Sequence, residues 1–253
     1  MMLSVKDLSV VFGHRCVVNN VSFTLEEGQW LMVVGPNGAG KTTLVSAIAQ
    51  TVPYKGAVSI LGQDARRMST ASLARAAAVL TQRHHVGYAF TVEEVVRLGR
   101  YAHQRGVFAK ADPEGTAKVE HALRITGLDA IRRQSVLTLS GGELQRTFLA
   151  QVFAQDPAVL LLDEPFNHLD LKYQRDTFSL ISSWLKQPGR AILSVMHDLS
   201  AARMYGTHAL LMSAGHIASY GACREALDPA SLKAVYGMDV WGWMQNMLSV
   251  WKQ

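Results

Sequence analysis

The sequence predicts an α/β protein with a parallel central sheet, an antiparallel β part at the N-terminus and an inserted all-helical segment. Three observations indicate this class. Short apolar runs alternate with stretches of helical composition, a pattern typical of parallel strands joined by helices. The first 25 residues alternate apolar and polar side chains, as strands with one solvated face do. Residues 91–155 carry helix caps and lack strand signals.

The N-terminal part supplies most of the early strands. Alternation predicts strands over residues 3–12 and 17–25, joined by a turn at residues 13–15. The five apolar residues 30–34 indicate a buried strand. A glycine-rich turn over residues 35–40 leads into a helix expected at residues 41–50. Further strands are expected at residues 57–61 and 76–81.

Helix signals dominate the middle of the chain. Thr91 and Glu94 have the spacing of a capping box. A second helix is expected from Asp112–Pro113 to Gly127, since proline is favoured in a first helical turn. Strand signals return at residues 159–162, 191–195, 208–212 and 216–219, with a helix expected over residues 171–186. We therefore expect one domain over 1–253, with an α/β core from 1–90 and 156–253 and a helical subdomain over 91–155.

Composition narrows the class of protein. The 253 residues are 49% hydrophobic and 18% charged, which excludes a disordered chain, a collagen-like chain and a coiled coil. The longest apolar runs fall short of the ~20 residues that span a bilayer. No signal peptide is visible and there are two cysteines, so a cytoplasmic compartment is expected. The net charge of +5 permits nucleic acid, an anionic membrane or phosphate as a partner.

The strongest motif follows the strand at 30–34. The pattern G-x-x-x-x-G-K-[ST] is matched at every position by Gly35, Pro36, Asn37, Gly38, Ala39, Gly40, Lys41 and Thr42. Glycines let successive backbone N–H groups curve around a phosphate, and the helix that follows presents its positive dipole end. Lys41 adds a charge near the β- and γ-phosphates, and the Thr42 hydroxyl is a natural Mg²⁺ ligand. The motif predicts a nucleoside triphosphate site.

Two acids end the apolar strand at 159–162. Ligands of parallel α/β sheets bind at the carboxyl ends of the strands, which is where Asp163 and Glu164 stand. Asp163 is expected to hold Mg²⁺, directly or through water, and Glu164 to polarise the attacking water as general base. A strand that simply ends in a solvated acidic turn is the alternative, and the neighbouring phosphate loop disfavours it.

A second glycine-rich turn lies at a helix start. Ser140, Gly141 and Gly142 precede a helix expected over residues 143–155, and Glu143 begins it. Such a turn forms an anion-binding nest, yet one triphosphate does not need two nests from one subunit. We therefore expect this nest to face the nucleotide of another copy. Taken alone, Ser-Gly-Gly-Glu is equally an ordinary helix cap.

With these motifs in place, the chain resembles the ATPase subunit of an ATP-binding cassette (ABC) transporter, whose core is a RecA-like P-loop NTPase fold. Residues 35–43, 159–164 and 139–143 resemble the Walker A loop, the Walker B strand and the family signature. Gln82 falls at the Q-loop position, and Asp170 closes a stretch that resembles the D-loop. His197 stands at the switch-histidine position, and Phe12 where the family more often has an adenine-stacking tyrosine.

The resemblance implies a head-to-tail homodimer that sandwiches two ATP molecules between Walker A of one copy and residues 140–143 of the other. It assigns Lys41 and the loop amides through Thr43 to the phosphates. It assigns Mg²⁺ to Thr42, Gln82 and Asp163. Catalysis would fall to Glu164 as base, His197 at the γ-phosphate, and Gln82 and Lys41 beside them, while Asp170 would connect the two sites.

A finer resemblance lies in residues 91–103 and in the tail motif 232–237, which look like importer ATPases for iron-siderophore, haem and cobalamin. It implies two copies of a membrane permease docked near residues 82–105, and a periplasmic or extracellular binding protein as an indirect partner. The location implied is the cytoplasmic side of the inner (cell) membrane, and no nucleic acid is expected. A soluble cassette ATPase acting on nucleic acid or in cofactor assembly stays open as the alternative.

Two further features of the sequence, a tryptophan-rich tail and a basic cluster, predict surface properties. Three of the five tryptophans lie in the last 13 residues, and alternation there suggests a hairpin that turns near residues 245–246. We expect this tail to pack on the chain's own sheet, with an adhesive patch as the alternative. Arg97, Arg100, Arg105 and Lys110 form a loose basic cluster near the expected dock, for which a solvated face is the favoured interpretation.

Overall fold

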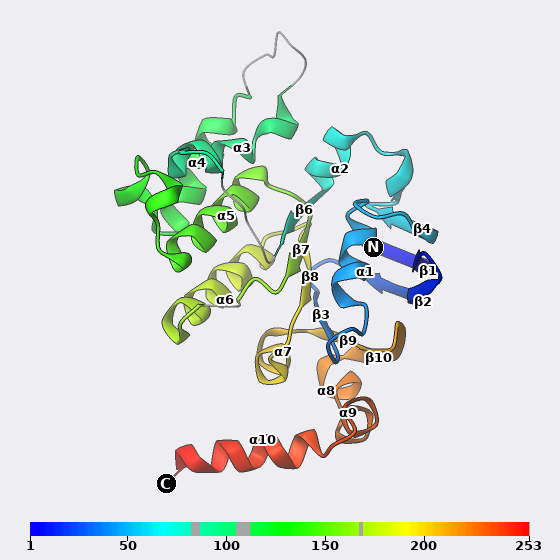
Figure 1. The fold of residues 1–253 in the computed structure, drawn as a ribbon. Coiled ribbons are helices and arrows are strands. Elements are labelled where there is room, and N and C mark those ends of the chain that lie inside the picture. The colour runs from blue at the N-terminus through cyan, green and yellow to red at the C-terminus, as the bar shows by residue number, and fades with distance from the viewer. Residues whose placement is uncertain (82–86, 105–111, 167–168, 253) are drawn as a thin grey trace.

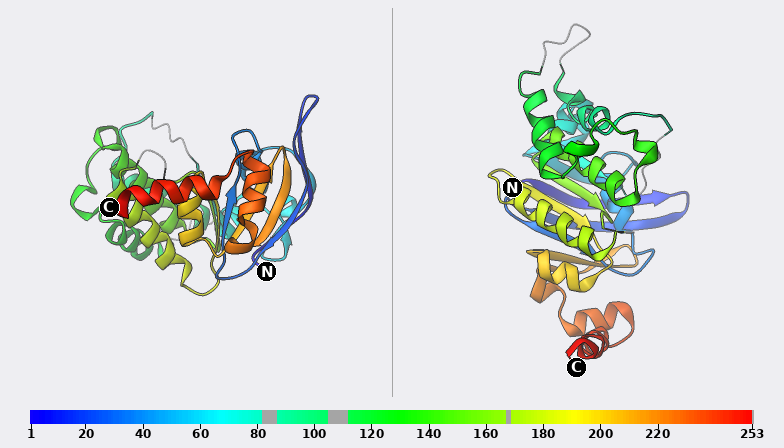
Figure 2. Two further views of the ribbon diagram at one scale, coloured as in Figure 1. Left: turned by 90° about the horizontal axis from the view of Figure 1, so that it is seen from below. Right: turned by 90° about the vertical axis from the view of Figure 1, so that its left-hand side faces the viewer.

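The computed structural model describes residues 1–81, 87–104, 112–166 and 169–252 (Figure 1). Within them the chain forms a six-stranded sheet of order β10-β9-β3-β8-β7-β6 and a four-stranded sheet of order β2-β1-β4-β5. Helices cover both faces of the larger sheet (Figures 1 and 2). The predicted α/β class, with its antiparallel opening and its parallel core, is confirmed.

The larger sheet is parallel except at one edge. Its parallel strands are β3 (Trp30–Val34), β6 (Ala77–Leu80), β7 (Val159–Asp163), β8 (Ala191–Val195) and β9 (His208–Ser213), and β10 (His216–Ala222) pairs antiparallel with β9. Every residue of β3, β7 and β8 is buried, which explains why the sequence shows continuous apolar runs there. Since the strands are parallel, the segments that follow β3, β7 and β8 emerge at the same edge.

The smaller sheet packs across a helix onto the larger one. It contains β1 (Leu3–Phe12), β2 (Arg15–Leu25), β4 (Lys55–Ile60) and β5 (Gln63–Asp64), all antiparallel. Helix α1 (Lys41–Ile48) lies between the two sheets, where Leu44 and Ile48 join one buried cluster with residues of both. The helix that carries the phosphate-loop motif is therefore fixed on both sides by the core.

The described part of residues 91–155 is helical apart from an isolated bridge between Thr91 and Ser135. Its elements are α3 (Val92–Leu98), η2 (Tyr101–His103), α4 (Gly115–Ile125), η3 (Asp129–Ile131), η4 (Val136–Thr138) and α5 (Gly141–Gln155). The predicted capping box of Thr91 and Glu94 is present at the start of α3. One buried cluster joins these helices to the face of the larger sheet opposite α1.

The basic cluster is not a solvated face throughout. Arg100 is 5% exposed, and its Nε donates to the Asp112 carboxylate at 2.7 Å. A buried guanidinium needs such a partner, so Arg100 serves the packing of the helical segment. Arg97 is half-exposed and pairs with Glu93. Arg105 and Lys110 lie outside the described residues.

The helix expected over residues 171–186 is confirmed as α6 (Leu171–Leu185), whereas the predicted C-terminal hairpin is wrong. The helices that were not predicted are η1 (Ala65–Arg67), α2 (Thr70–Ala76), α7 (Leu199–Tyr205), α8 (Cys223–Ala226), α9 (Pro229–Tyr236), α10 (Val240–Ser249) and η5 (Val250–Lys252). Asp239 caps α10 by accepting a hydrogen bond from the Gly242 N–H at 3.0 Å, and Val240 and Met244 share one face at helical spacing. Helix α10 follows α9 away from the sheet (Figure 2), so apart from Val240 and Met244, which join the main core cluster, the expected packing of the tail on the sheet is wrong.

No helix among the described residues combines the length and the apolar character needed to cross a bilayer.

Candidate functional site

The segments that follow β3, β7 and β8 meet at one edge of the larger sheet and enclose a cavity of about 350 Å³. The residues that line it are Phe12, Arg15, Val17, Asn37, Gly38, Ala39, Gly40, Lys41, Thr42, Thr43, Glu164 and His197. The structure thus brings most of the predicted site residues together within one chain. Gln82 lies outside the described residues, so its expected place at this cavity stays a prediction.

The backbone of the loop at residues 35–40 requires its glycines. Gly35 has φ +146° and Gly40 has φ +99°, and a Cβ at Gly35 would lie 2.2 Å from the carbonyl oxygen of Met212. A Cβ at Gly40 would lie 2.7 Å from the Val17 carbonyl oxygen. Neither position can therefore hold a side chain without moving the sheet. Pro36 accepts a hydrogen bond from the Ala39 N–H, which closes the turn ahead of α1.

Lys41 is folded back onto this loop. It is 6% exposed, and its Nζ donates to the carbonyl oxygens of Gly35 at 2.7 Å and Pro36 at 3.0 Å. Burial lowers the pKa of Lys41, while the nearby carboxylates of Glu164 and Asp163 act in the opposite direction. Lys41 is also the first residue of α1, where the helix dipole disfavours a cation. A bound anion would relieve both costs, as expected of a phosphate site.

Thr42 and Asp163 form a pair of hard oxygen ligands. The Thr42 hydroxyl donates to Oδ1 of Asp163 at 3.1 Å, and Asp163, at the end of β7, is 7% exposed. Burial raises the pKa of Asp163, and the Thr42 hydrogen bond partly offsets this. A hydroxyl and a carboxylate beside a phosphate loop are the donors that Mg²⁺ takes in nucleotide sites. The residues present therefore fit the predicted metal.

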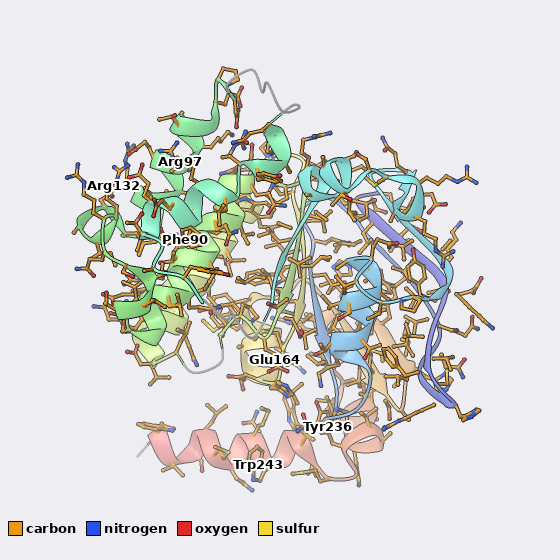
Figure 3. All side chains as sticks on the ribbon, turned by 45° about the horizontal axis from the view of Figure 1, so that its top comes forward. Phe90, Arg97, Arg132, Glu164, Tyr236 and Trp243 are labelled. Atoms are coloured by element: carbon orange, nitrogen blue, oxygen red, sulfur yellow. The ribbon has the colours of Figure 1, made fainter. Side chains whose placement is uncertain are left out.

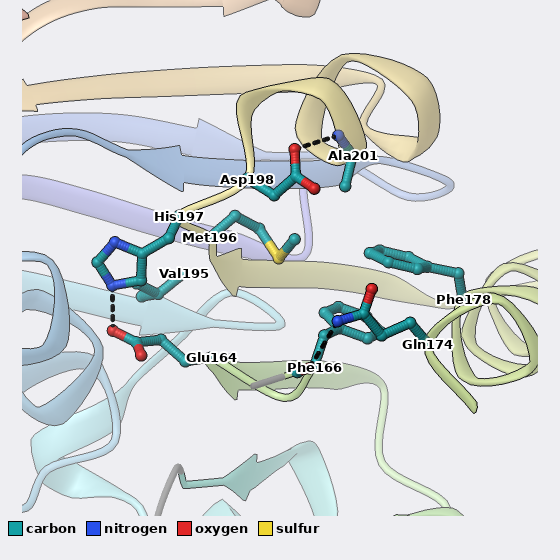
Figure 4. Close-up of a pocket in the computed structure, with 9 residues that line it drawn as sticks. All are labelled: Glu164, Phe166, Gln174, Phe178, Val195, Met196, His197, Asp198 and Ala201. Carbon is teal, nitrogen blue, oxygen red and sulfur yellow. Dashed lines mark hydrogen bonds and ion pairs between the residues drawn. The ribbon is translucent and has the colours of Figure 1, made fainter. Parts of the chain in front are cut away.

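Glu164 and His197 are joined across the ends of β7 and β8. Nε2 of His197 lies 2.6 Å from Oε1 of Glu164 (Figure 4). Glu164 has φ +53°, a left-handed conformation that is uncommon outside glycine and clusters at functional sites. A small cavity of about 60 Å³ behind the pair is lined by Phe166, Phe178 and Met196 among others. The carboxylate is thus held at the phosphate cavity, in the place that a general base would need.

The aromatic predicted for adenine stacking lies at the same cavity. Phe12 is 48% exposed at the end of β1, although an apolar side chain on an alternating strand is more often buried. Arg15, across the tight turn, also lines the cavity and was missed by sequence reasoning. An arginine near an aromatic residue in a hairpin is a common sequence pattern, so nothing in the sequence marked Arg15 as a site residue.

The nest at residues 140–143 does not line this cavity in the described chain. Ser140 caps α5, and both its N–H and its hydroxyl donate to Oε2 of Glu143, at 2.8 and 2.7 Å. These hydrogen bonds lower the pKa of Glu143. Gly141 and Gly142 occupy the first helical positions. The cap is therefore present, and contact with the nucleotide of another copy stays a prediction.

Three further contacts tie other elements to the site. Nε2 of Gln145, on α5, donates to the Pro165 carbonyl at 2.9 Å and so links the helical segment to the acidic loop. Asp170 caps α6 by accepting from the Tyr173 N–H at 2.9 Å, and its role between two sites stays a prediction. Burial raises the pKa of Tyr236, at the end of α9, and the nearby backbone of Gly35 acts in the opposite direction. Sequence reasoning missed Gln145 and Tyr236, because neither belongs to the glycine-rich or acidic patterns.

Comparison with known proteins identifies the same part of the chain. A family model described as "ABC transporter" matches residues 18–167. An uncharacterized ABC transporter ATP-binding protein, YvrA of Bacillus subtilis, is 40% identical over 94% of this chain, and the chain spans 54% of the length of that protein. The achromobactin transport ATP-binding protein CbrD of Dickeya dadantii is 36% identical over 92% of this chain and 87% of its own length. The hemin import ATP-binding protein HmuV of Pseudomonas entomophila is 39% identical over 94% of each.

Solved structures share the fold. A structure titled as an ATP binding subunit of an ABC transporter superposes with a TM-score of 0.79 over 95% of each chain, at 23% sequence identity. That level of identity supports the architecture described above and leaves residue roles to the geometry of this chain.

Proposed function

Because the chain belongs to the ABC transporter family, we propose that it is the ATP-binding and ATP-hydrolysing subunit of an ABC importer that takes up a metal chelate, such as an iron-siderophore, haem or cobalamin. The observation that carries the ATPase part is the cavity lined by the glycine loop, Lys41, Thr42 and the Glu164–His197 pair, with Asp163 bonded to Thr42 beside it. The glycine loop with Lys41 can bind the phosphates, Thr42 and Asp163 can bind the metal, and Glu164 can act as the base.

Binding begins with an exchange of partners at Lys41. Its ammonium leaves the carbonyl oxygens of Gly35 and Pro36 and takes the β- and γ-phosphate oxygens, while the loop N–H groups cradle the chain of phosphates. Phe12, exposed at the mouth of the cavity, offers its face to the adenine ring. Thr42 and Asp163, with Gln82, would hold Mg²⁺, which neutralises charge on the β- and γ-phosphates.

Hydrolysis needs a positioned water more than covalent chemistry from the protein. Glu164 accepts a proton or a hydrogen bond from that water, and its strained backbone and its contact with His197 hold the carboxylate in place. His197, whose side chain is 41% exposed, can reach a γ-phosphate from the same position. Both side chains lie within the 350 Å³ cavity.

The second half of the site comes from another copy of the chain. Ser140, Gly141 and Gly142 stand at the start of α5, where backbone N–H groups and the helix dipole favour an anion, and a symmetric dimer would bring them to the partner's γ-phosphate. Leu171, directly after Asp170, is 84% exposed, as expected of a residue that a partner covers. ATP then acts as a clamp between two cassettes, and its hydrolysis releases them.

The expected permease dock carries exposed aromatic and aliphatic side chains. Tyr88 and Tyr101 are 74% and 75% exposed, and Phe90 and Leu98 are 42% and 51% exposed. These residues flank or belong to α3, next to the Q-loop position. A large apolar patch of this kind is typical of a protein contact. We place the chain on the cytoplasmic side of the inner membrane, held there through two permease subunits, with a binding protein as an indirect partner.

The class of cargo rests on relatives and on two short motifs. The relatives are named for achromobactin transport and for hemin import. Residues 91–103 and 232–237 resemble the same subgroup. In such systems the permease and the binding protein select the cargo, so the cassette supports a class and not a compound.

The deciding experiment is co-expression of the chain with the membrane and binding proteins encoded beside it. The complex is purified in lipid nanodiscs, and ATP hydrolysis is measured with candidate metal chelates. We expect a stable complex whose ATPase activity rises with one chelate bound to its binding protein. Recovery of the chain only as a free subunit, with ATPase activity stimulated by nucleic acid, would refute the importer.

A further inference from the structure

The last helix of the chain presents an unusual surface. Helix α10 and the turn after it hold Trp243, Met247, Leu248, Val250 and Trp251, which are 53%, 53%, 53%, 70% and 88% exposed. No charged residue occurs between residues 240 and 251. A run of large apolar side chains left in water and free of charge is costly for a monomer, and marks a contact surface.

Only the first turns of α10 are anchored to the body of the chain. Val240 is 5% exposed, and Met244 packs against the main core. The guanidinium of Arg203, on α7, lies 4.8 Å from the centre of the Trp241 ring. These contacts fix where the helix starts, so the exposed second half projects as a defined surface and not as a loose tail.

An unfilled groove separates α10 from the nucleotide site. It has a volume of about 500 Å³ and is lined by His197, Leu199, Tyr236, Trp243, Met247 and Trp251 among others. We call it the α10 groove. The groove is open to solvent, and its lining includes two tryptophans and three methionines, so it offers a partner apolar surface to cover. In Figure 3, Trp243 on α10 and Tyr236 at the end of α9 lie below Glu164.

His197 connects the α10 groove to the phosphate cavity. It lines both of them, and its Nε2 lies 2.6 Å from Oε1 of Glu164. Whatever fills the groove therefore touches a side chain that also contacts the expected base.

We propose that the exposed apolar face of α10 packs against a second copy of this chain when ATP closes the cassette dimer. The inference rests on the proposed function, in which a partner nest must approach the γ-phosphate beside His197. A partner that comes this close to His197 also comes to the groove of which His197 is a wall. By symmetry each copy contributes one such face, so the contact forms twice.

Other occupants fit the surface less well. Helix α10 lies at the end of the molecule opposite α3, away from the expected permease dock (Figure 1). Helices that lie on anionic membranes carry Lys or Arg on their polar face, and nucleic-acid surfaces are basic, whereas α10 has no charge. A second copy of the chain is the occupant that remains. It would reach this face only when ATP is bound and the dimer closes.

The test uses the full chain with Glu164→Gln, so that ATP stays bound, and measures the dimer dissociation constant by analytical ultracentrifugation with ATP and Mg²⁺. Adding Met247→Gln and Leu248→Gln keeps helix-forming residues but removes apolar contact. We expect the dissociation constant to rise at least about tenfold. The matched control replaces Leu61, 45% exposed, by glutamine, and should leave the constant unchanged.

A second measurement remains valid if the double variant folds poorly. In the Glu164→Gln chain, acrylamide quenching of tryptophan fluorescence should fall when ATP is added, because Trp243 and Trp251 become covered. Replacing both by phenylalanine should abolish that protection while the ATP-dependent dimer persists. Protection that survives in the phenylalanine variant, or that never occurs, contradicts the proposal.

The remaining outcomes separate this inference from the proposed function. If the Glu164→Gln chain stays monomeric with ATP, the shared nucleotide site fails and the α10 contact fails with it. If it dimerises and the α10 variant dimerises equally well, only the α10 contact is refuted. If the α10 variant forms a tighter dimer, α10 normally blocks the nucleotide-binding face of its own chain, and the proposed contact with a second copy is refuted. Sedimentation of the chain with anionic phospholipid vesicles, lost in the α10 variant with the dimer unchanged, would assign the surface to lipid.

Discussion

Replacing Glu164 by glutamine separates binding from chemistry at the proposed site. Glutamine has the same shape, and its Oε1 can still accept the hydrogen bond that spans 2.6 Å to Nε2 of His197. It tolerates φ +53° no worse than glutamate. The substitution removes the negative charge and the ability to take a proton, and leaves the loop around Lys41 untouched.

The expected magnitudes differ sharply for the two steps. A positioned general base contributes about 10²- to 10⁴-fold to a rate, which is roughly 3 to 5.5 kcal/mol of barrier. The half-solvated contact with His197 is worth at most ~1 kcal/mol, so ATP affinity should change by less than about fivefold. We therefore predict a turnover number lower by about 10²- to 10⁴-fold with ATP binding almost intact.

The assay pairs steady-state phosphate release with titration of a fluorescent ATP analogue. The exposed Glu225, on α8, provides the matched control as Glu225→Gln, which should hydrolyse ATP at the wild-type rate. Hydrolysis by Glu164→Gln within about threefold of wild type would show that Glu164 is not the base. A loss of ATP binding equal to the loss of rate would show that the side chain shapes the site instead.

Three further variants test the loop and the helical segment. Lys41→Ala removes a charged donor worth about 3 kcal/mol to phosphate, so ATP affinity should fall at least about 100-fold in the same titration. Gly35→Ala forces a Cβ to within 2.2 Å of a carbonyl oxygen at φ +146°, and should destabilise the chain by roughly 2 to 5 kcal/mol in urea unfolding. Arg132→Gln removes the donor that lowers the pKa of Glu93 and Glu120 below their ordinary value of 4.5. Those carboxylates stabilise the fold above that pH, so the loss of melting temperature should be full near pH 6 and should vanish as the pH falls through the lowered pKa values of the two carboxylates.

For each of these three variants, one result would contradict the prediction. Gly62 also has positive φ but open space around its Cβ, so Gly62→Ala should cost clearly less than Gly35→Ala. Equal costs would mean that the contact with the sheet is unimportant. An ATP affinity unchanged by Lys41→Ala would remove Lys41 from the phosphate site. A melting difference for Arg132→Gln that persists at low pH would attribute the effect to packing and not to ionisation.

Prediction from sequence succeeded where a pattern has one physical cause. The strand Trp30–Val34 was predicted with its observed bounds because a strand buried on both faces shows an unbroken apolar run. Helix α2 escaped because its alanine-rich end passes directly into β6 with no breaker between them. Helix α10 was mistaken for a hairpin since Val240, Trp241 and Trp243 with glycine between also satisfy a short alternation.

Some features of the candidate site could likewise be predicted from the sequence, and others could not. The order of strands and motifs was enough to expect Lys41, Thr42 and Asp163 at one sheet edge, because parallel strands end together. It could not show that Lys41 is bonded to its own loop or that His197 meets Glu164. Those contacts depend on side-chain rotamers and on packing between distant segments, which no local pattern encodes.

The central claim is that each ATP site is completed by a second copy, and mixing two inactive variants tests it most directly. Lys41→Ala damages the phosphate loop. Gly141→Asp puts a carboxylate in the nest, where a Cβ meets nothing within 4 Å and an acid suits the helix start, so the fold should survive. We predict that neither variant hydrolyses ATP alone and that their mixture regains hydrolysis, since a mixed dimer pairs an intact loop with an intact nest. A mixture as inactive as its components, with mixed dimers shown to form, would contradict the shared site.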